Sequence, residues 1–409
     1  MPWYRPVRVC HVTSGSEFGW RTGSGKWPKY YPDNLPGILE VGQGSPTGIV
    51  SATASHFPPP YNSGLFVCDW SFGTMYHIAL QSSGASFTAT ASEFLNGTPL
   101  PLTDLTFGAE GAMYFTTGGR RLESGLYRVW SDKNGQKKEK EIASKNLELR
   151  RLLDTFHDTS LVADYDVIWE NIGNKDRYIA FSARIALENH GVNNWASYIN
   201  SETELNKKVA YGIAVARSNN KKLQQQLLKA LSQVESSQLT PSEQLSIIRA
   251  ESLLIIRNKD LNIKVIENQW LPIFPSKNQF INEELAALFN KTQNSVWVGK
   301  IMKLWSEIDK EYLKILISDS LANRSEMYGP TVKAMRKRRP RSYKIALSSA
   351  LSHYKVGWNT ALRNAYFNGF NEFWDREGGN SYRGYLLKIL SNALNNLPRA
   401  DRSKFEKIS

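Results

Sequence analysis

Cysteine is nearly absent from this chain of 409 residues, which contains only Cys10 and Cys68. Two cysteines so far apart form neither the Cys-x-x-Cys pair of a zinc knuckle nor the Cys-x-x-Cys-His motif that attaches haem c. They also cannot supply the several bridges of a disulfide-rich fold. We therefore expect neither structural zinc, nor bound haem c, nor a disulfide framework in this chain.

Long apolar runs are also missing, since the sequence holds no stretch of about 18 apolar residues. The first residues, Met1-Pro-Trp-Tyr-Arg-Pro-Val-Arg8, lack the apolar segment of a secretory signal. We therefore expect no transmembrane segment and no signal peptide in this chain.

The net charge of +13 is unevenly distributed along the sequence. Residues 1–130 hold equal numbers of basic and acidic residues, so the whole excess falls in the second part. Residues 131–147 are polar, charged and rich in turn-forming residues, as linkers are. We expect a first domain over residues 1–130, a charged linker over 131–147 and a second domain over 148–409.

The first domain consists of short β-rich runs separated by glycine, proline, asparagine and serine, which predicts an all-β unit. It contains an internal repeat: Leu65-Phe-Val-Cys68 with Thr74-Met-Tyr-His-Ile78, and Met113-Tyr-Phe-Thr116 with Gly125-Leu-Tyr-Arg-Val129. A repeat of about 40 to 50 residues is typical of β-propeller blades. Gly108 and Gly111 predict a tight turn with positive φ between two strands. About three blades fit before residue 130, too few to close a propeller.

Several motifs carry a resemblance to a known family. They are Glu17-Phe-Gly-Trp-Arg-Thr-Gly-Ser-Gly-Lys-Trp-Pro-Lys-Tyr-Tyr-Pro-Asp33, Gly44-Ser-Pro-Thr-Gly48, the turn of residues 104–116 and Gly378-Gly-Asn-Ser-Tyr-Arg-Gly-Tyr385. The pattern resembles the closing blades of quinoprotein glucose, aldose and sorbosone dehydrogenases. It is more similar to the large membrane-bound dehydrogenases of planctomycete-type bacteria, in which a propeller, helical repeats and a C-terminal cytochrome c domain follow one another. The resemblance covers nearly the whole chain.

The resemblance implies that the protein takes part in oxidising a sugar or related alcohol, with electrons passed to cytochrome c. It also implies export, with a periplasmic or membrane-associated location. Met1 falls where the family's propeller is already under way, and Ser409 falls where a cytochrome domain would begin. We therefore expect a fragment that is inactive alone and whose partners are the missing blades and a cytochrome c domain or protein.

The resemblance gives this chain no cofactor of its own. Relatives hold the carboxylates of pyrroloquinoline quinone with a lysine from one blade and two arginines from the next. The corresponding segments here, Asp69-Trp70-Ser71 and Pro101-Leu102-Thr103-Asp104, contain no cation. We expect a quinone of that kind, or haem c, only in a complete protein.

From about Leu147, apolar residues recur at spacings of three and four, which predicts amphipathic helices. The expected helices are 148–158, 163–171, 177–189, 203–216, 220–234 and 241–256. Asp176 is expected to cap one of them, and Pro241 to open another behind Thr240. The segment of residues 176–188 resembles the second helix of a HEAT repeat, so we predict an irregular all-α HEAT-like solenoid. Such a surface also suits a non-enzymatic scaffold that binds a protein or glycan, which is the alternative function.

The candidate site residues lie near expected strand ends, where propeller active sites form. His11 is a candidate catalytic base, since the resemblance places its segment beside the central funnel. Asp104 is a second catalytic candidate, or it ties turns together by accepting backbone hydrogen bonds. Candidates for binding substrate are Trp20, Arg21, Thr47, Asp69 and Trp70, although tryptophans also serve to pack blades.

Three further patterns have simpler interpretations. Gly23-Ser-Gly-Lys26 lacks the spacing and the strand and helix context of a phosphate-binding loop, which favours an ordinary turn. The basic segment from Lys333 to Lys344 could attract anions, but without a recognition motif we do not expect specific binding of nucleic acid. The six histidines are scattered without i, i+4 pairs, so no metal site is expected.

Overall fold

The computed structural model describes residues 6–21, 26–133, 135, 144–308, 319–338, 341–376 and 382–405. Small antiparallel β-sheets come first in the chain and helices follow, which confirms the predicted order of β and α regions. The segments of residues 22–25 and 377–381 lie outside the described residues, and with them most of Gly23-Ser-Gly-Lys26 and the start of the motif at Gly378.

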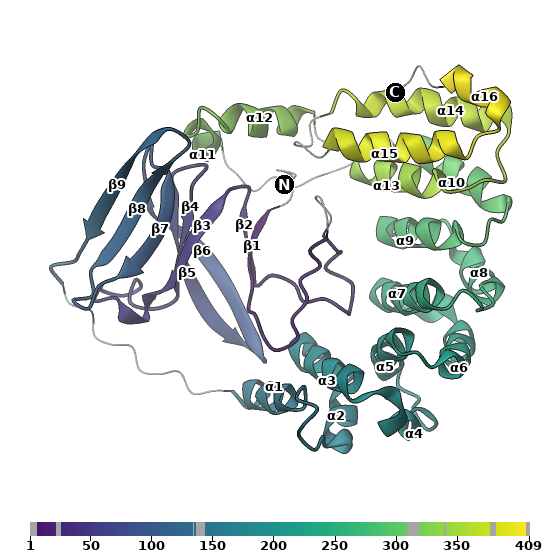
Figure 1. Ribbon diagram of the computed structural model, residues 1–409, viewed down its shortest axis with the longest axis horizontal. Helices are drawn as coiled ribbons and strands as arrows, with labels where there is room; N and C mark the ends of the chain where they lie inside the picture. Colours follow the sequence, from purple (N-terminus) through teal and green to yellow (C-terminus); the bar gives the residue numbers. More distant parts are fainter. Residues whose placement is uncertain are drawn as a thin grey trace.

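In the part of the chain that the structure describes, the β region contains three antiparallel sheets (Figure 1). Strands β1 (Val7–Val9) and β2 (Leu39–Gly42) pair with each other. A four-stranded sheet has the order β3 (Pro46–Ser51), β4 (Leu65–Asp69), β5 (Thr74–Ser83) and β6 (Ser86–Asn96). A three-stranded sheet has the order β7 (Leu102–Phe107), β8 (Met113–Gly119) and β9 (Leu122–Val129). In both larger sheets the strands follow sequence order, so hairpins connect them.

Apolar side chains hold the two larger sheets together. Phe66 and Met75 of the first sheet and Met113 and Phe115 of the second belong to one buried cluster. The predicted repeat falls on equivalent strands, since its halves begin β4 and β8 and continue in β5 and β9. The predicted turn forms at Gly111, with φ 75°, whereas Gly108 does not adopt positive φ.

The helices begin at Lys145. They are α1 (Lys145–Thr155), α2 (Tyr165–Asn171), α3 (Arg177–His190), α4 (Ala196–Ile199), α5 (Leu205–Arg217), α6 (Lys221–Ser232), α7 (Pro241–Arg257), α8 (Lys264–Trp270), α9 (Gln279–Phe289), α10 (Val296–Ser306), α11 (Asp319–Asn323), α12 (Gly329–Lys337), α13 (Ser342–Leu351), α14 (Thr360–Phe370), α15 (Tyr382–Asn395) and α16 (Arg399–Phe405). Two predicted helix starts are confirmed. Asp176 caps α3 by accepting from the backbone of Tyr178, and Thr240 forms a capping box with Glu243 ahead of Pro241.

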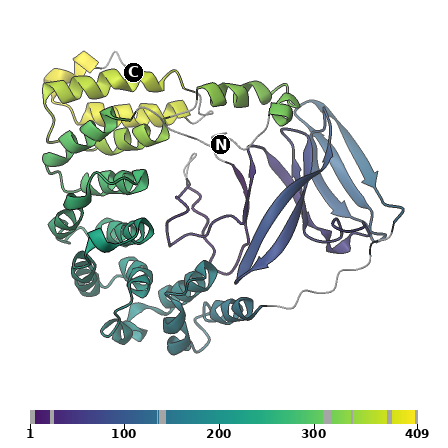
Figure 2. The ribbon, with the colours of Figure 1, turned by 180° about the vertical axis from the view of Figure 1, so that it is seen from behind.

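Five helices form an inner row, in which α3 packs on α5, α5 on α7, α7 on α9, and α9 on α13. The helices follow an arc, and the chain between β1 and β2 lies inside it (Figures 1 and 2). We call this segment, residues 10–38, the N-terminal loop. It therefore stands between the sheets and the inner row.

The helical region also returns to the sheets through α11 and α12. Phe72, from the turn after β4, packs against Leu321 and Val332 of these helices. Arg324 forms an ion pair of 2.9 Å with Glu93 of β6. Among the described residues, no helix has the length and apolar character needed to span a bilayer.

Candidate functional site

A cavity of about 330 Å³ lies between β1 and the four-stranded sheet. The chain just after β1 contributes Cys10 and His11, and the start of β3 contributes Thr47. The rest of the wall is mainly apolar, with Leu80 and Phe87 from the sheet. The structure thus brings together two of the predicted site residues, His11 and Thr47, which are 36 residues apart in the sequence.

His11 is held in a fixed orientation at this cavity. Its Nδ1 lies 2.9 Å from Oγ of Ser86, and its ring stacks on Tyr178 of α3 with centroids 5.5 Å apart. Burial lowers the pKa of His11 below its usual value, and the positive charge of Arg150 lowers it further. The imidazole is therefore neutral near pH 7, in the form that can accept a proton.

Asp69 lies beside a smaller cavity that shares Val7, Pro46 and Val67 with the first. Its Oδ1 accepts hydrogen bonds from the backbone N–H of Ser45, at 2.6 Å, and of Ser71, at 3.2 Å. Its Oδ2 has no hydrogen-bond partner. Burial raises the pKa of Asp69 to about 6, despite the backbone hydrogen bonds that lower it. Asp69 thus ties two turns together, and its carboxyl group does not reach the larger cavity.

Asp104 and Thr47 connect the two larger sheets. The hydroxyl of Thr47 donates to the carbonyl oxygen of Leu102, at 2.9 Å. A side chain at Gly48 would place its Cβ 2.7 Å from Oδ1 of Asp104, so only glycine fits there. Oδ1 of Asp104 also accepts from the backbone N–H of Leu105, at 2.8 Å. The geometry therefore fits the simpler interpretation of Asp104, a carboxylate that accepts backbone hydrogen bonds.

Trp20, Arg21 and Trp70 do not line the cavity of His11. Arg21 pairs with Glu17 at 3.2 Å, and its guanidinium carbon lies 3.5 Å from the ring centre of Trp27. Trp20 is about half exposed, at 48%, and its ring lies 4.2 Å from Nζ of Lys26.

Trp70 directly follows β4, and its backbone N–H donates to the carbonyl oxygen of Ser45 at 3.0 Å. Its side-chain Nε1 donates to the carbonyl oxygen of Gly118 at 2.8 Å, and Tyr328, the residue before α12, contacts its ring. The seven candidates therefore fall into separate groups and do not form one site.

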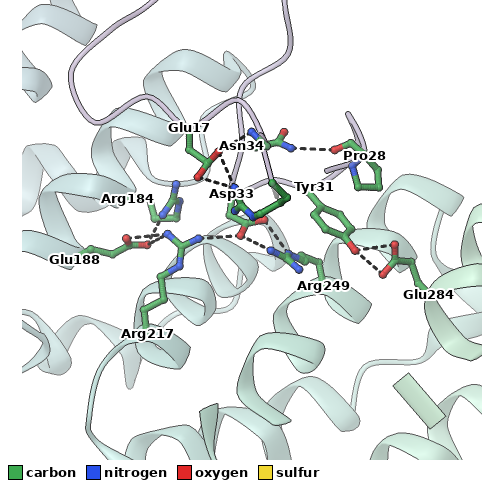
Figure 3. Close-up of polar contacts among 12 residues, drawn as sticks. Glu17, Pro28, Tyr31, Asp33, Asn34, Arg184, Glu188, Arg217, Arg249 and Glu284 are labelled. Carbon is green, nitrogen blue, oxygen red and sulfur yellow. Dashed lines mark hydrogen bonds and ion pairs between the residues drawn. The ribbon is translucent and has the colours of Figure 1, made fainter. Parts of the chain in front are cut away.

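An extensive polar cluster around Asp33 was not predicted from the sequence. Asp33 of the N-terminal loop is fully buried, and its two oxygens accept from Nε and Nη2 of Arg249 at 2.9 and 2.8 Å (Figure 3). Arg217 donates to the same carboxylate at 2.8 Å and also pairs with Glu188. Burial alone would raise the pKa of Asp33, but the hydrogen bond and charge of Arg249, with the charge of Arg217, hold it below its usual value.

Other contacts fix the same loop to the inner helices. The hydroxyl groups of Tyr30 and Tyr31 both donate to Glu284 of α9, at 2.8 Å. Arg177 of α3 donates to the backbone carbonyl oxygens of Lys29, at 2.6 Å, and of Asn34, at 2.6 Å, and to that of Tyr31. The tyrosines and Asp33 lie within the motif Glu17–Asp33. This motif is the feature of the sequence that could have pointed to the cluster.

The basic segment is partly engaged in contacts within the chain. Lys344 pairs with Glu372 at 2.8 Å, and its Nζ lies 4.1 Å from the ring centre of Trp305. Arg341 lies 3.7 Å from the same carboxylate. The side chains of residues 335–337, and all of 339–340, lie outside the described residues. Two of the basic groups are thus occupied by an internal acid.

The described residues contain no group of three histidine, cysteine, aspartate or glutamate side chains that could hold a metal ion. Cys10 and Cys68 are not paired with each other. Comparison with known proteins gave no match to a family model, to a curated protein or to a solved structure.

Proposed function

We propose that this chain is the substrate-facing part of a propeller-type sugar or alcohol dehydrogenase that passes electrons to cytochrome c. The observation that carries the proposal is the imidazole of His11, which is oriented by Ser86 at a cavity of about 330 Å³ and whose pKa is lowered by burial. A neutral imidazole can accept the hydroxyl proton of an alcohol as it is oxidised. The mainly apolar wall suits the carbon skeleton of such a substrate.

The proposal includes a fold assignment, in which the four-stranded and three-stranded sheets are successive propeller blades. Supporting this, both sheets are hairpin-connected in sequence order, pack on each other and carry the internal repeat. The inner row of helices, with α2 packed on α3 and α6 packed on α5 and α7, supports a HEAT-like solenoid for the second part. We propose a periplasmic or membrane-associated location on the resemblance alone.

Pyrroloquinoline quinone does not fit this cavity. Its three carboxylates require several cations, and Arg8 is the one basic side chain other than His11 in the described wall. The nearby Asp69 would add a carboxyl group of its own rather than a cation. The electron acceptor therefore belongs to another part of the proposed enzyme.

The test is dye-linked dehydrogenase activity over a panel of aldoses and alcohols. It compares the purified chain with the same chain extended into the neighbouring coding sequence. We expect activity only in the extended protein. Within it, His11→Asn should abolish the activity, whereas the matched variant His353→Asn, far from the cavity, should keep it. Equal activity of the His11→Asn and His353→Asn proteins would refute the role of His11.

A scaffold is the second candidate function, and the buried network around Asp33 favours it. This network fixes the N-terminal loop against four inner helices without presenting a reactive group to solvent. If neither the purified chain nor the extended chain shows dehydrogenase activity, this function is favoured, with a protein or glycan as the partner.

A further inference from the structure

A tight turn in the N-terminal loop presents Ser14 at the surface. The backbone N–H of Ser16 donates to the carbonyl oxygen of Thr13 at 3.2 Å, and the hydroxyl of Ser16 donates to the same oxygen at 2.7 Å. Gly15 has φ 67°, and a Cβ at this position would lie 2.9 Å from Cγ2 of Ile185 in α3. The turn therefore lies directly against α3, which fixes the position of Ser14.

Ser14 contacts the imidazole of His157, which lies just after α1. Oγ of Ser14 is 2.7 Å from Nδ1 of His157. The other ring nitrogen, Nε2, lies 2.9 Å from the backbone carbonyl oxygen of Ser182 in α3. Because a carbonyl oxygen only accepts, Nε2 carries the proton, and Nδ1 of the neutral ring is unprotonated. The hydroxyl of Ser14 therefore donates to Nδ1, as a serine nucleophile does to its general base.

The groups around His157 maintain this arrangement. The hydroxyl of Ser182 donates to Asp154 at 2.6 Å, and Asp154 pairs with Arg150. Burial lowers the pKa of His157 below its usual value, against the backbone hydrogen bond to Ser182 and the charge of Asp154, which raise it. The positive charges of Arg184 and Arg150 lower it further. The imidazole is therefore mainly neutral near pH 7, in the form that accepts a proton.

Two further features suit acyl transfer to this serine. Ser14 is exposed, so the carbonyl carbon of an ester can approach its Oγ. Within the described residues, the backbone N–H of Gly15, next to the nucleophile, has no acceptor. An N–H at this position can stabilise the negative oxygen of a tetrahedral intermediate.

We propose that Ser14 and His157 act as nucleophile and general base in the hydrolysis of small carboxylic esters. Oγ of Ser14 bonds to the ester carbonyl carbon while Nδ1 of His157 takes the hydroxyl proton. The intermediate then expels the alcohol oxygen, which receives this proton, and acyl-Ser14 remains. Water, deprotonated by Nδ1, displaces the acyl group as a carboxylic acid, and the proton returns to Oγ. The pair uses no residue that lines the cavity of His11 and does not depend on the dehydrogenase proposal.

The test is the reaction of the full chain with a fluorophosphonate and with p-nitrophenyl acetate. The fluorophosphonate forms a P–O bond to an activated serine and releases fluoride, and peptide mass spectrometry should place the adduct on Ser14. Ser160 is the internal control, because it is also exposed but donates to the carboxylate of Asp158, at 2.7 Å. Labelling of Ser160 as fast as Ser14, or no labelling of Ser14 at millimolar reagent, would overturn the proposal.

Three variants separate the chemistry from the packing. Ser14→Ala should abolish labelling at this position and the release of p-nitrophenolate. His157→Gln can keep both hydrogen bonds but has no basic nitrogen, so both rates should fall about 100-fold or more. His190→Gln is the matched control and should react as the parent does, since Nε2 of His190 also donates to a backbone carbonyl oxygen, that of Phe156, at 2.9 Å.

The pH profile gives a second readout. In the parent, the labelling rate should rise as the pH passes through the lowered pKa of His157, and this rise should be absent in His157→Gln. Equal labelling rates of the His157→Gln and His190→Gln proteins would show that His157 only packs against the turn, and the proposal would be wrong.

Discussion

Replacing Asp33 by asparagine should destabilise the protein more than any comparable change at its surface. The carboxylate is fully buried, and it neutralises Arg249, which is only 6% exposed, and shares Arg217 with Glu188. Removing one partner of a buried ion pair leaves an uncompensated charge, which costs about 3–5 kcal/mol of unfolding free energy. The Asp33→Asn substitution keeps the volume of the side chain, so this loss reflects charge and hydrogen bonding.

Urea unfolding followed by tryptophan fluorescence measures the effect, since Trp27 lies 4.3 Å from the guanidinium of Arg249. The matched control is Asp260→Asn, which breaks the ion pair with Lys221, also 2.8 Å long but 72–75% exposed. This control should leave the unfolding curve unchanged, because exposed pairs contribute little.

The pH gives a second measurement of the same contact. Because the pKa of Asp33 is held below its usual value, its contribution is complete above that value and is lost as the pH falls through the lowered one. In the Asp33→Asn protein this part of the acid sensitivity should disappear. If Asp33→Asn and Asp260→Asn unfold at the same urea concentration, the network does not hold the loop and the reasoning is wrong.

Other predictions concern Glu251, Gly48 and Thr240. Burial raises the pKa of Glu251 from 4.5 to about 8. The free energy of unfolding should therefore fall by up to about 1.4 kcal/mol per pH unit as the pH rises between these values. Glu251→Gln should abolish this dependence in urea unfolding measured from about pH 5 to pH 8. An unchanged slope would contradict the buried neutral carboxyl. Gly48→Ala should lower the melting temperature by forcing Cβ against Asp104, and Asp104→Gly should restore part of it. No change in the melting temperature would contradict this close contact. Thr240→Ala should cost about 1 kcal/mol, measured by urea unfolding, whereas Thr240→Ser should cost less because it keeps the cap.

The sequence predicts local structure well in this chain because local signals act over a few residues. The capping residues Asp176 and Thr240 start helices where expected, and the repeat marks equivalent hairpins. The turn prediction was right at Gly111 and wrong at Gly108, whose backbone does not need positive φ.

The packing of the N-terminal loop could not be predicted in the same way. Asp33 meets Arg217 and Arg249 across 184 and 216 residues, and no local pattern encodes such a partnership. His11 and Thr47 were predicted as members of one site and line one cavity, whereas the ring of Trp70 contacts Tyr328, the residue before α12. A sequence can predict which residues lie near the end of a strand, but it does not predict which distant segment packs against them.

The N-terminal loop has a consequence for synthesis of the protein. Tyr31 is made early, but its partner Glu284 follows 253 residues later. At typical elongation rates of about 5–20 residues per second, the loop waits roughly 13–50 s before α9 exists. Helices α3, α5 and α7 are made earlier, so during that time the two tyrosines lack only the contacts of α9: their shared acceptor Glu284 and, for Tyr30, the ring of Phe280. Synthesis of α9, rather than of the sheets, then sets when the loop gains these contacts.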